Sequence, residues 1–151
     1  MDFHYYEHHN KLTIDCPPKD YMPLNIKAFR WVFGQNEEKN FQSQYEKDGK
    51  RKKPPKRYND MTDLEKCERM ALSMFVSFEW AENQFFFFRD NQNLQENAYL
   101  WLGESIAVGE ILVSDGVNEV PANKFGHFNH HPALGFDYHN TFQIISCFCK
   151  L

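Results

Sequence analysis

Short runs of apolar and aromatic residues, bounded by turn-forming residues, recur along the chain and are typical of β-strands. One is residues 26–33 (IKAFRWVF), a run that Gly34 ends. In such a strand Arg30 lies on the opposite face from its neighbours Phe29 and Trp31. Further strands are predicted at residues 4–6, 11–14, 106–113 and 141–151.

The middle of the chain, residues 63–91, has helical spacing instead. Thr62 and Glu65 stand in the positions of a capping box, so a helix is predicted to begin there. Ser77 precedes acidic residues and predicts the start of a second helix, so the first is expected to end within residues 70–81. The apolar residues with helical spacing in the first helix are Leu64, Cys67, Ala71, Met74 and Phe75.

The second predicted helix contains a run of phenylalanines at residues 85–88. Rings at consecutive positions point to every side of a helix, so we expect this helix to be central to the core. Residues 118–140 are rich in turn-forming side chains and predict a loop zone. Strands that flank a helical centre, without a repeat, indicate an α+β fold.

Length and composition narrow the picture further. A chain of 151 residues is close to the usual size of one domain, so a single compact domain over residues 1–151 is expected. Aromatic residues make up 17% of the chain, and 15 of them are Phe, which predicts a core built from rings. The formal charge of -4 excludes a uniformly basic protein that coats nucleic acid, but it permits a local basic patch.

Such a patch lies within a predicted flexible loop at about residues 44–60, in the stretch KDGKRKKPPKR at residues 47–57. Clustered Lys and Arg make phosphate contacts that do not depend on base sequence, so this loop is the candidate contact for RNA or DNA. The alternatives are a solvated loop and a docking segment for an acidic protein partner such as an antitoxin. The candidate nucleic-acid-binding residues are Lys50, Arg51, Lys52, Lys53, Lys56 and Arg57.

The cysteines and the N-terminus bear on the compartment. No apolar run approaches the ~18 residues of a membrane span, and the N-terminus has no apolar signal region, so a soluble, cytoplasmic protein is expected. We expect no membrane partner. The four cysteines, Cys16, Cys67, Cys147 and Cys149, have no spacing typical of a disulfide framework. Reduced thiols are therefore predicted.

A histidine-rich segment, residues 126–132, precedes His139, Cys147 and Cys149 and raises the question of zinc. The spacing is poor for a structural zinc site, so no metal ligand is assigned. His127 follows Gly126 in a predicted loop, where an acid-base histidine is often presented. A histidine with a purely structural role is the alternative.

Several short motifs resemble one family. They are the runs at 71–81 (ALSMFVSFEWA), 106–107 (IA), 115–117 (DGV) and 126–128 (GHF). In this order they resemble small bacterial proteins of the ADP-ribosyltransferase-like fold, among them toxins of toxin–antitoxin pairs. The resemblance covers residues 70–132.

The resemblance implies a cleft for NAD. In that fold an Arg or His of the first strand, a central Ser or Tyr and a later Glu line the cleft, and Arg30, Ser73 or Ser77, and Glu119 are the matching residues here. Departing from the family pattern, the last third contains no clear Glu-x-Glu or Gln-x-Glu pair. The implied function is transfer of ADP-ribose from NAD to a macromolecular acceptor, either protein or nucleic acid.

The chemistry of NAD binding and ADP-ribose transfer explains why residues of these types would line the cleft. The fork of Arg30 matches a pyrophosphate, a serine can position a ribose, and an aromatic ring such as Trp31 or Phe33 can stack on nicotinamide. Glu119 would stabilise the oxocarbenium-like centre that forms as nicotinamide leaves, with His127 as a helper. The structural alternatives are a surface ion pair for Arg30, a helix cap for Ser77 and a packing role within the helix for Ser73.

Two other functions fit the same sequence. One is a non-catalytic binding module of the immunity or antitoxin type, which would have no affinity for NAD and a large exposed apolar patch. The other is a zinc-binding protein that binds nucleic acid, which would contain stoichiometric metal and lose its fold with a chelator.

Overall fold

The computed structural model describes residues 1–49 and 60–148 of the chain. All six candidate nucleic-acid-binding residues of the basic segment lie outside these ranges, so their assignment stays a prediction. The part of the predicted loop that is described, residues 44–49, is helical.

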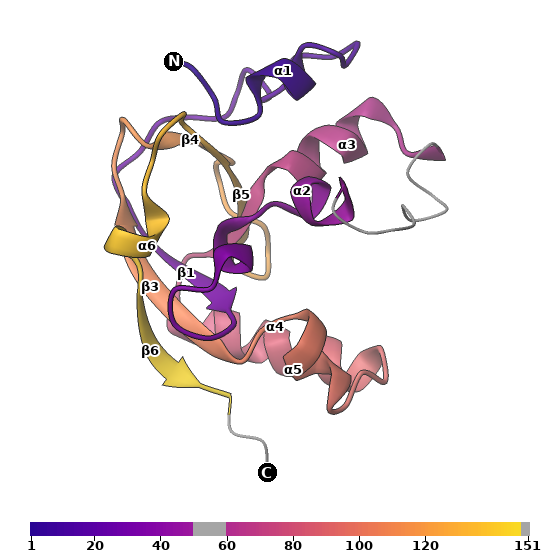
Figure 1. The fold of residues 1–151 in the computed structure, drawn as a ribbon, viewed down its shortest axis with the longest axis vertical. Coiled ribbons are helices and arrows are strands. Elements are labelled where there is room, and N and C mark those ends of the chain that lie inside the picture. Colours follow the sequence, from indigo (N-terminus) through magenta and orange to yellow (C-terminus); the bar gives the residue numbers. More distant parts are fainter. Residues whose placement is uncertain (50–59, 149–151) are drawn as a thin grey trace.

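The centre of the protein is one sheet of six strands in the order β4-β5-β2-β1-β3-β6. Every neighbouring pair is antiparallel, and Figure 1 shows the sheet curving past the helices. β1 and β2 are its two middle strands. The strands are β1 (Ile26–Val32), β2 (Leu72–Phe75), β3 (Ser105–Ile111), β4 (Gly116–Asn118), β5 (His127–Pro132) and β6 (Gln143–Cys147).

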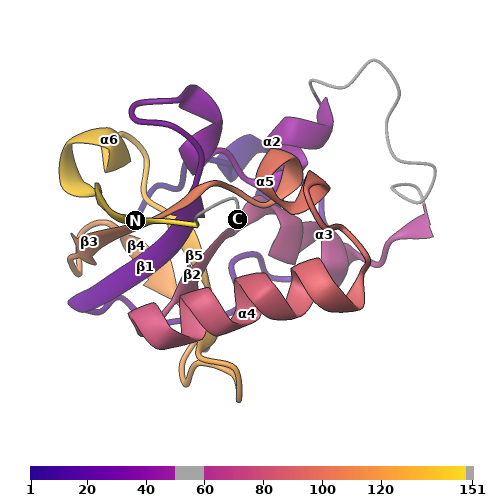
Figure 2. The same cartoon turned by 90° about the horizontal axis from the view of Figure 1, so that it is seen from below.

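The helices are short except for α4, which lies across one side of the sheet (Figure 2). α2 and α3 lie beside one another, away from β3 and β6 (Figure 1). The helices are α1 (Tyr6–His9), the 3-10 helix η1 (Glu38–Phe41), α2 (Gln44–Gly49), α3 (Asp63–Met70), α4 (Phe78–Asn91), α5 (Asn97–Trp101) and α6 (Tyr138–Thr141).

The two faces of the sheet contribute to two apolar clusters. Ala28 and Val32 of β1 face a cluster that includes Phe142, which follows α6. The neighbouring Phe29 faces the other cluster, in which Phe85 of α4 stacks on Phe148 with ring centroids 3.7 Å apart. This alternation is the two-residue period of a strand buried on both faces.

The structure confirms the predicted α+β class and several elements. The predicted strands at residues 26–33 and 106–113 are β1 and β3, and the last predicted strand contains β6. Both predicted helix starts are confirmed by their caps. Thr62 Oγ1 accepts a hydrogen bond from the Glu65 amide, and Ser77 Oγ accepts one from the Trp80 amide.

Three local predictions were wrong. The first helix does not extend through Ala71, because residues 72–75 form β2 between β5 and β1. Helical spacing misled here because three of the four residues of β2 are apolar and buried, on both of its faces, so apolar residues do not alternate with polar ones throughout. Residues 4–6 and 11–14 form no strand: Tyr6 begins α1, and residues 11–14 follow that helix. The predicted loop zone contains β5, whose ladder pairs His130 with Leu72.

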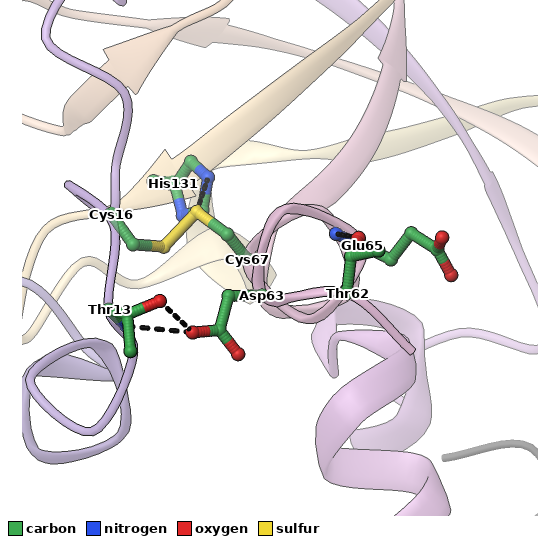
Figure 3. Close-up of a disulfide and its surroundings, with 7 residues drawn as sticks. All are labelled: Thr13, Cys16, Thr62, Asp63, Glu65, Cys67 and His131. Atoms are coloured by element: carbon green, nitrogen blue, oxygen red, sulfur yellow. Dashed lines mark hydrogen bonds between the residues drawn. A yellow bond between two sulfur atoms is a disulfide. The ribbon is translucent and has the colours of Figure 1, made fainter. Parts of the chain in front are cut away.

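The prediction of reduced thiols was also wrong for two cysteines. Cys16 and Cys67 form a disulfide with their Cα atoms 5.8 Å apart (Figure 3). They are 51 residues apart in sequence, and only the packing of the N-terminal segment against α3 brings them together. Cys147 is free and exposed, whereas Cys149 lies outside the described residues. Within the described ranges, no helix is both long and apolar enough to span a bilayer.

Candidate functional site

A cleft with a volume of about 480 Å³ opens where the two middle strands meet the helices. α2 and α3 lie on one side and α5 on the other, with β1 and β2 between them (Figure 1). Its lining residues are mainly polar or aromatic. Those used below are Arg30, Trp31, Lys47, Glu65, Glu68, Arg69, Ser73 and Trp101.

Arg30 forms the inner part of the cleft and is only 8% exposed. Its Nε donates to the Asn40 carbonyl over 2.7 Å, and Nη1 donates to the Ser73 carbonyl over 2.7 Å. Nη2 makes a longer bond of 3.4 Å to the Gln42 carbonyl. Burial lowers the pKa of Arg30 to about 10. The guanidinium therefore holds three chain segments together. Because carbonyl groups carry no net charge, these hydrogen bonds leave the positive charge of Arg30 unneutralised.

Two tryptophans contribute aromatic surface to the cleft. Trp31 is half-buried and its Nε1 donates to the Ala81 carbonyl over 2.8 Å, which fixes the ring against α4. Trp101, at the end of α5, is 66% exposed. A large exposed ring at a cleft offers a stacking surface for a planar ligand.

Charged and hydroxyl groups surround these rings. Ser73 is exposed although it belongs to a central strand, because the cleft opens above it. Glu65 and Glu68 are spaced three residues apart on α3, which places them on one face of the helix. Partial burial, reinforced by the nearby Glu119 and Glu65 carboxylates, raises the pKa of Glu68. Lys47 and Arg69 add positive charge to the lining.

The structure brings together three of the residues expected from the sequence. Arg30, Trp31 and Ser73 line the cleft, whereas Ser77 caps α4 and does not line it. Glu119 accepts a hydrogen bond from the Asn129 amide and is also absent from the lining.

His127 lies on β5 opposite Phe75 and is likewise outside the cleft lining. Burial and the charge of Arg30 lower the pKa of His127. The ring is therefore neutral at pH 7, as a histidine with a structural role would be.

Sequence reasoning missed Glu65, Glu68 and Trp101. The two glutamates had a signal, because a capping-box Glu followed by a second Glu three residues later presents two carboxylates on one helix face. Trp101 had none, since its exposure depends on how α5 packs rather than on its local sequence.

A buried polar network lies among the apolar side chains next to the cleft. Asn118 donates through Nδ2 to the Met22 carbonyl, which leaves its Oδ1 to accept from His130 Nδ1 over 2.8 Å. His130 Nε2 then accepts from the Tyr138 hydroxyl over 2.6 Å. Burial, with a smaller contribution from Arg30, lowers the pKa of His130 to about 3, so this histidine is neutral and held in one tautomer.

No family model, no curated protein and no solved structure matches the chain. The residues of the cleft and their chemistry are therefore the basis for assigning a function.

Proposed function

We propose that the cleft binds NAD and that the protein transfers ADP-ribose from NAD to a macromolecular acceptor in the cytoplasm. The observation that carries this proposal is the meeting of Arg30, Trp31 and Ser73 in one cleft. These residues come from two strands. The family resemblance implied a role in NAD binding for Arg30 and for Ser73 or Ser77, and stacking chemistry suggested one for Trp31. With that resemblance, the proposal extends to an ADP-ribosyltransferase-like fold.

The size and the lining of the cleft support a nucleotide ligand. Its volume of about 480 Å³ lies within the range of small-molecule and cofactor sites. Trp101 presents an exposed ring on which a base or the nicotinamide can stack. Stacking of this kind contributes roughly 1–3 kcal/mol for each base on an aromatic side chain.

The positive charges support binding of the pyrophosphate. Arg30 is the deepest of them, and its donors are directed to carbonyl groups, so its contribution is a fixed positive potential at the inner end of the cleft. Lys47 and Arg69 are the positive residues on the helices around it. A phosphate group in the cleft would offset the charge that burial leaves on Arg30.

Glu68 takes the catalytic role that the sequence suggested for Glu119. It lies in the cleft, and Glu119 acts on it only through the charge that raises its pKa. As nicotinamide departs, positive charge develops on the ribose, and a nearby carboxylate stabilises it. An acceptor nucleophile then attacks the anomeric carbon, and Glu65 is the second carboxylate available as its general base.

Isothermal titration of the purified protein with NAD tests binding. We expect saturable heat for the wild-type chain and about 5- to 150-fold weaker binding for Trp101→Ala, since stacking is lost. Leu100→Ala is the matched control, because Leu100 is 65% exposed on the same helix but does not line the cleft. Glu68→Gln should bind NAD but no longer release nicotinamide from it.

Absence of heat at millimolar NAD would contradict the proposal. A partner-binding module would then be the favoured function. The exposed Leu100 and Trp101 side chains of α5 would form part of its docking surface.

A further inference from the structure

Two histidines lie against the disulfide between Cys16 and Cys67. His131 Nε2 is 3.9 Å from Cys67 Sγ, and Figure 3 shows this ring directed at the sulfur atoms. Donor atoms of His9, Cys16 and His131 all lie within 4.8 Å of one another. The four side chains come from α1, the following loop, α3 and β5, so folding alone assembles the cluster.

Both histidines are buried, and at least one ring nitrogen of each lacks a hydrogen-bond partner among the described residues. His9 is 4% exposed and His131 is 1% exposed. In the described part of the chain, neither ring nitrogen of His9 has a hydrogen-bond partner, and Nδ1 of His131 has none. A buried polar atom without a hydrogen-bond partner lowers the stability of the fold by about 1–3 kcal/mol. Three such nitrogen atoms lie beside two sulfurs here, and a bound ligand would give them a partner.

We propose that His9, Cys16, Cys67 and His131 form a Cys2His2 zinc site in the reduced chain. Two thiolates and two neutral imidazoles are a donor set that favours tetrahedral zinc. With Zn–N of about 2.0 Å and Zn–S of about 2.3 Å, tetrahedral donors lie roughly 3.3–3.8 Å apart. The His131 to Cys67 separation of 3.9 Å is already close to this value. The sulfurs of Cys16 and Cys67 are bonded to one another and must separate to bind a metal as two thiolates, which reduction allows.

The site therefore has two alternative states. A cellular dithiol transfers two electrons and two protons to the Cys16–Cys67 disulfide. The disulfide is thereby reduced to two thiols, and the dithiol is oxidised to a disulfide. Zinc binding then releases the two thiol protons as the thiolates coordinate the metal. In both states α1 and its loop remain fastened to α3, the helix that carries Glu65 and Glu68 into the cleft. The proposal is independent of NAD binding, because none of its four ligands lines the cleft.

Titration of the untagged chain with Co²⁺ tests the site, because tetrahedral Co²⁺ bound to thiolates has visible ligand-field bands and a near-ultraviolet charge-transfer band. The wild-type chain is reduced with a phosphine under anaerobic conditions before the titration. We expect these bands to saturate at one equivalent, to vanish when Zn²⁺ is added, and to be absent from the disulfide-bonded chain. Elemental analysis should then find one zinc per reduced chain.

Variants assign the ligands. Cys16→Ser, Cys67→Ser and His131→Asn should each weaken the metal affinity by more than about 100-fold. Loss of a group that only hydrogen-bonds to a metal ligand already lowers metal affinity about 10–100-fold, and these variants remove a ligand itself. Cys147→Ser is the matched control, because Cys147 is a free, exposed thiol outside the cluster, and it should leave the spectrum unchanged.

The comparison of oxidised with reduced wild-type protein needs no variant to fold. If the reduced wild-type chain binds no stoichiometric metal, or if its Co²⁺ spectrum lacks the thiolate band, the proposal is overturned. The same conclusion follows if Cys147→Ser alone removes the band.

Discussion

At the scale of single residues, the position of Arg30 in its strand was predicted correctly, but its hydrogen-bonding role was not. The alternation of residues 26–33 predicted that Arg30 lies opposite two rings, and it does. The sequence also suggested a fork directed at a ligand, whereas the fork binds carbonyl groups of Asn40, Gln42 and Ser73. Local sequence cannot distinguish these roles, because Asn40 lies in η1, Gln42 follows it, and Ser73 belongs to another strand.

The Arg30→Ala variant should lower the free energy of unfolding by about 3 kcal/mol or more, because it leaves buried carbonyls without donors. Arg30→Lys should cost less, since an ammonium can still donate to some of them. Denaturant unfolding measures both. An Arg30→Ala variant as stable as the wild-type chain would show that these hydrogen bonds do not organise the cleft.

His130 predicts a pH dependence of stability. Its pKa in the folded protein is about 3, below the 6.5 of an unperturbed histidine. Between these values the unfolded chain binds a proton that the folded chain does not, so stability falls as the pH is lowered. For the disulfide-bonded chain, His130 should contribute a loss of about 1.4 kcal/mol per pH unit below pH 6.

Chemical denaturation at a series of pH values measures this slope. His130→Gln should be less stable than the wild type at pH 7 and should show a shallower dependence on pH. Parallel curves for the two proteins would mean that His130 is not the neutral, buried group of this network.

At the scale of elements, the predictions that rest on helix caps were correct. Thr62 and Ser77 mark helix starts because their side chains bond to amides three residues along the chain, which depends on local sequence alone. β2 was misread because the apolar residues after α3 continue its spacing by chance, and strand pairing decided their conformation. Long-range pairing of this kind has no local signal.

The run of phenylalanines in α4 provides a direct test of its orientation. Phe85 is fully buried against Phe148, whereas Phe87 is 51% exposed, so the helix is not buried on every side as the sequence suggested. Phe85→Ala should cost about 3–5 kcal/mol of stability, as other large truncations in cores do. Phe87→Ala is the matched control and should change stability by less than about 0.5 kcal/mol. Equal losses in thermal unfolding would contradict the placement of α4.

At the scale of the whole molecule, the sequence predicted the α+β class but not the groups that meet in space. The cleft combines residues from β1, β2, α3 and α5, and the cluster of His9, Cys16, Cys67 and His131 combines four segments. Arg30 and Ser73 were anticipated because a resemblance named them, and Trp31 because an aromatic ring can stack on nicotinamide. The cysteine and histidine cluster was not, because its members have no local ligand spacing.

The measurement that most directly tests the central claim is a titration of uniformly ¹⁵N-labelled protein with NAD, followed by amide chemical shifts. If NAD occupies the cleft, the largest shifts should fall on its lining residues, among them Ser43, Lys47, Glu65, Ser73 and Trp101. A second cavity, lined by Phe41 and Tyr138, shares Gln42 with the cleft, and its other lining residues should be unaffected. No shifts at millimolar NAD, or shifts centred on that second cavity, would contradict the claim.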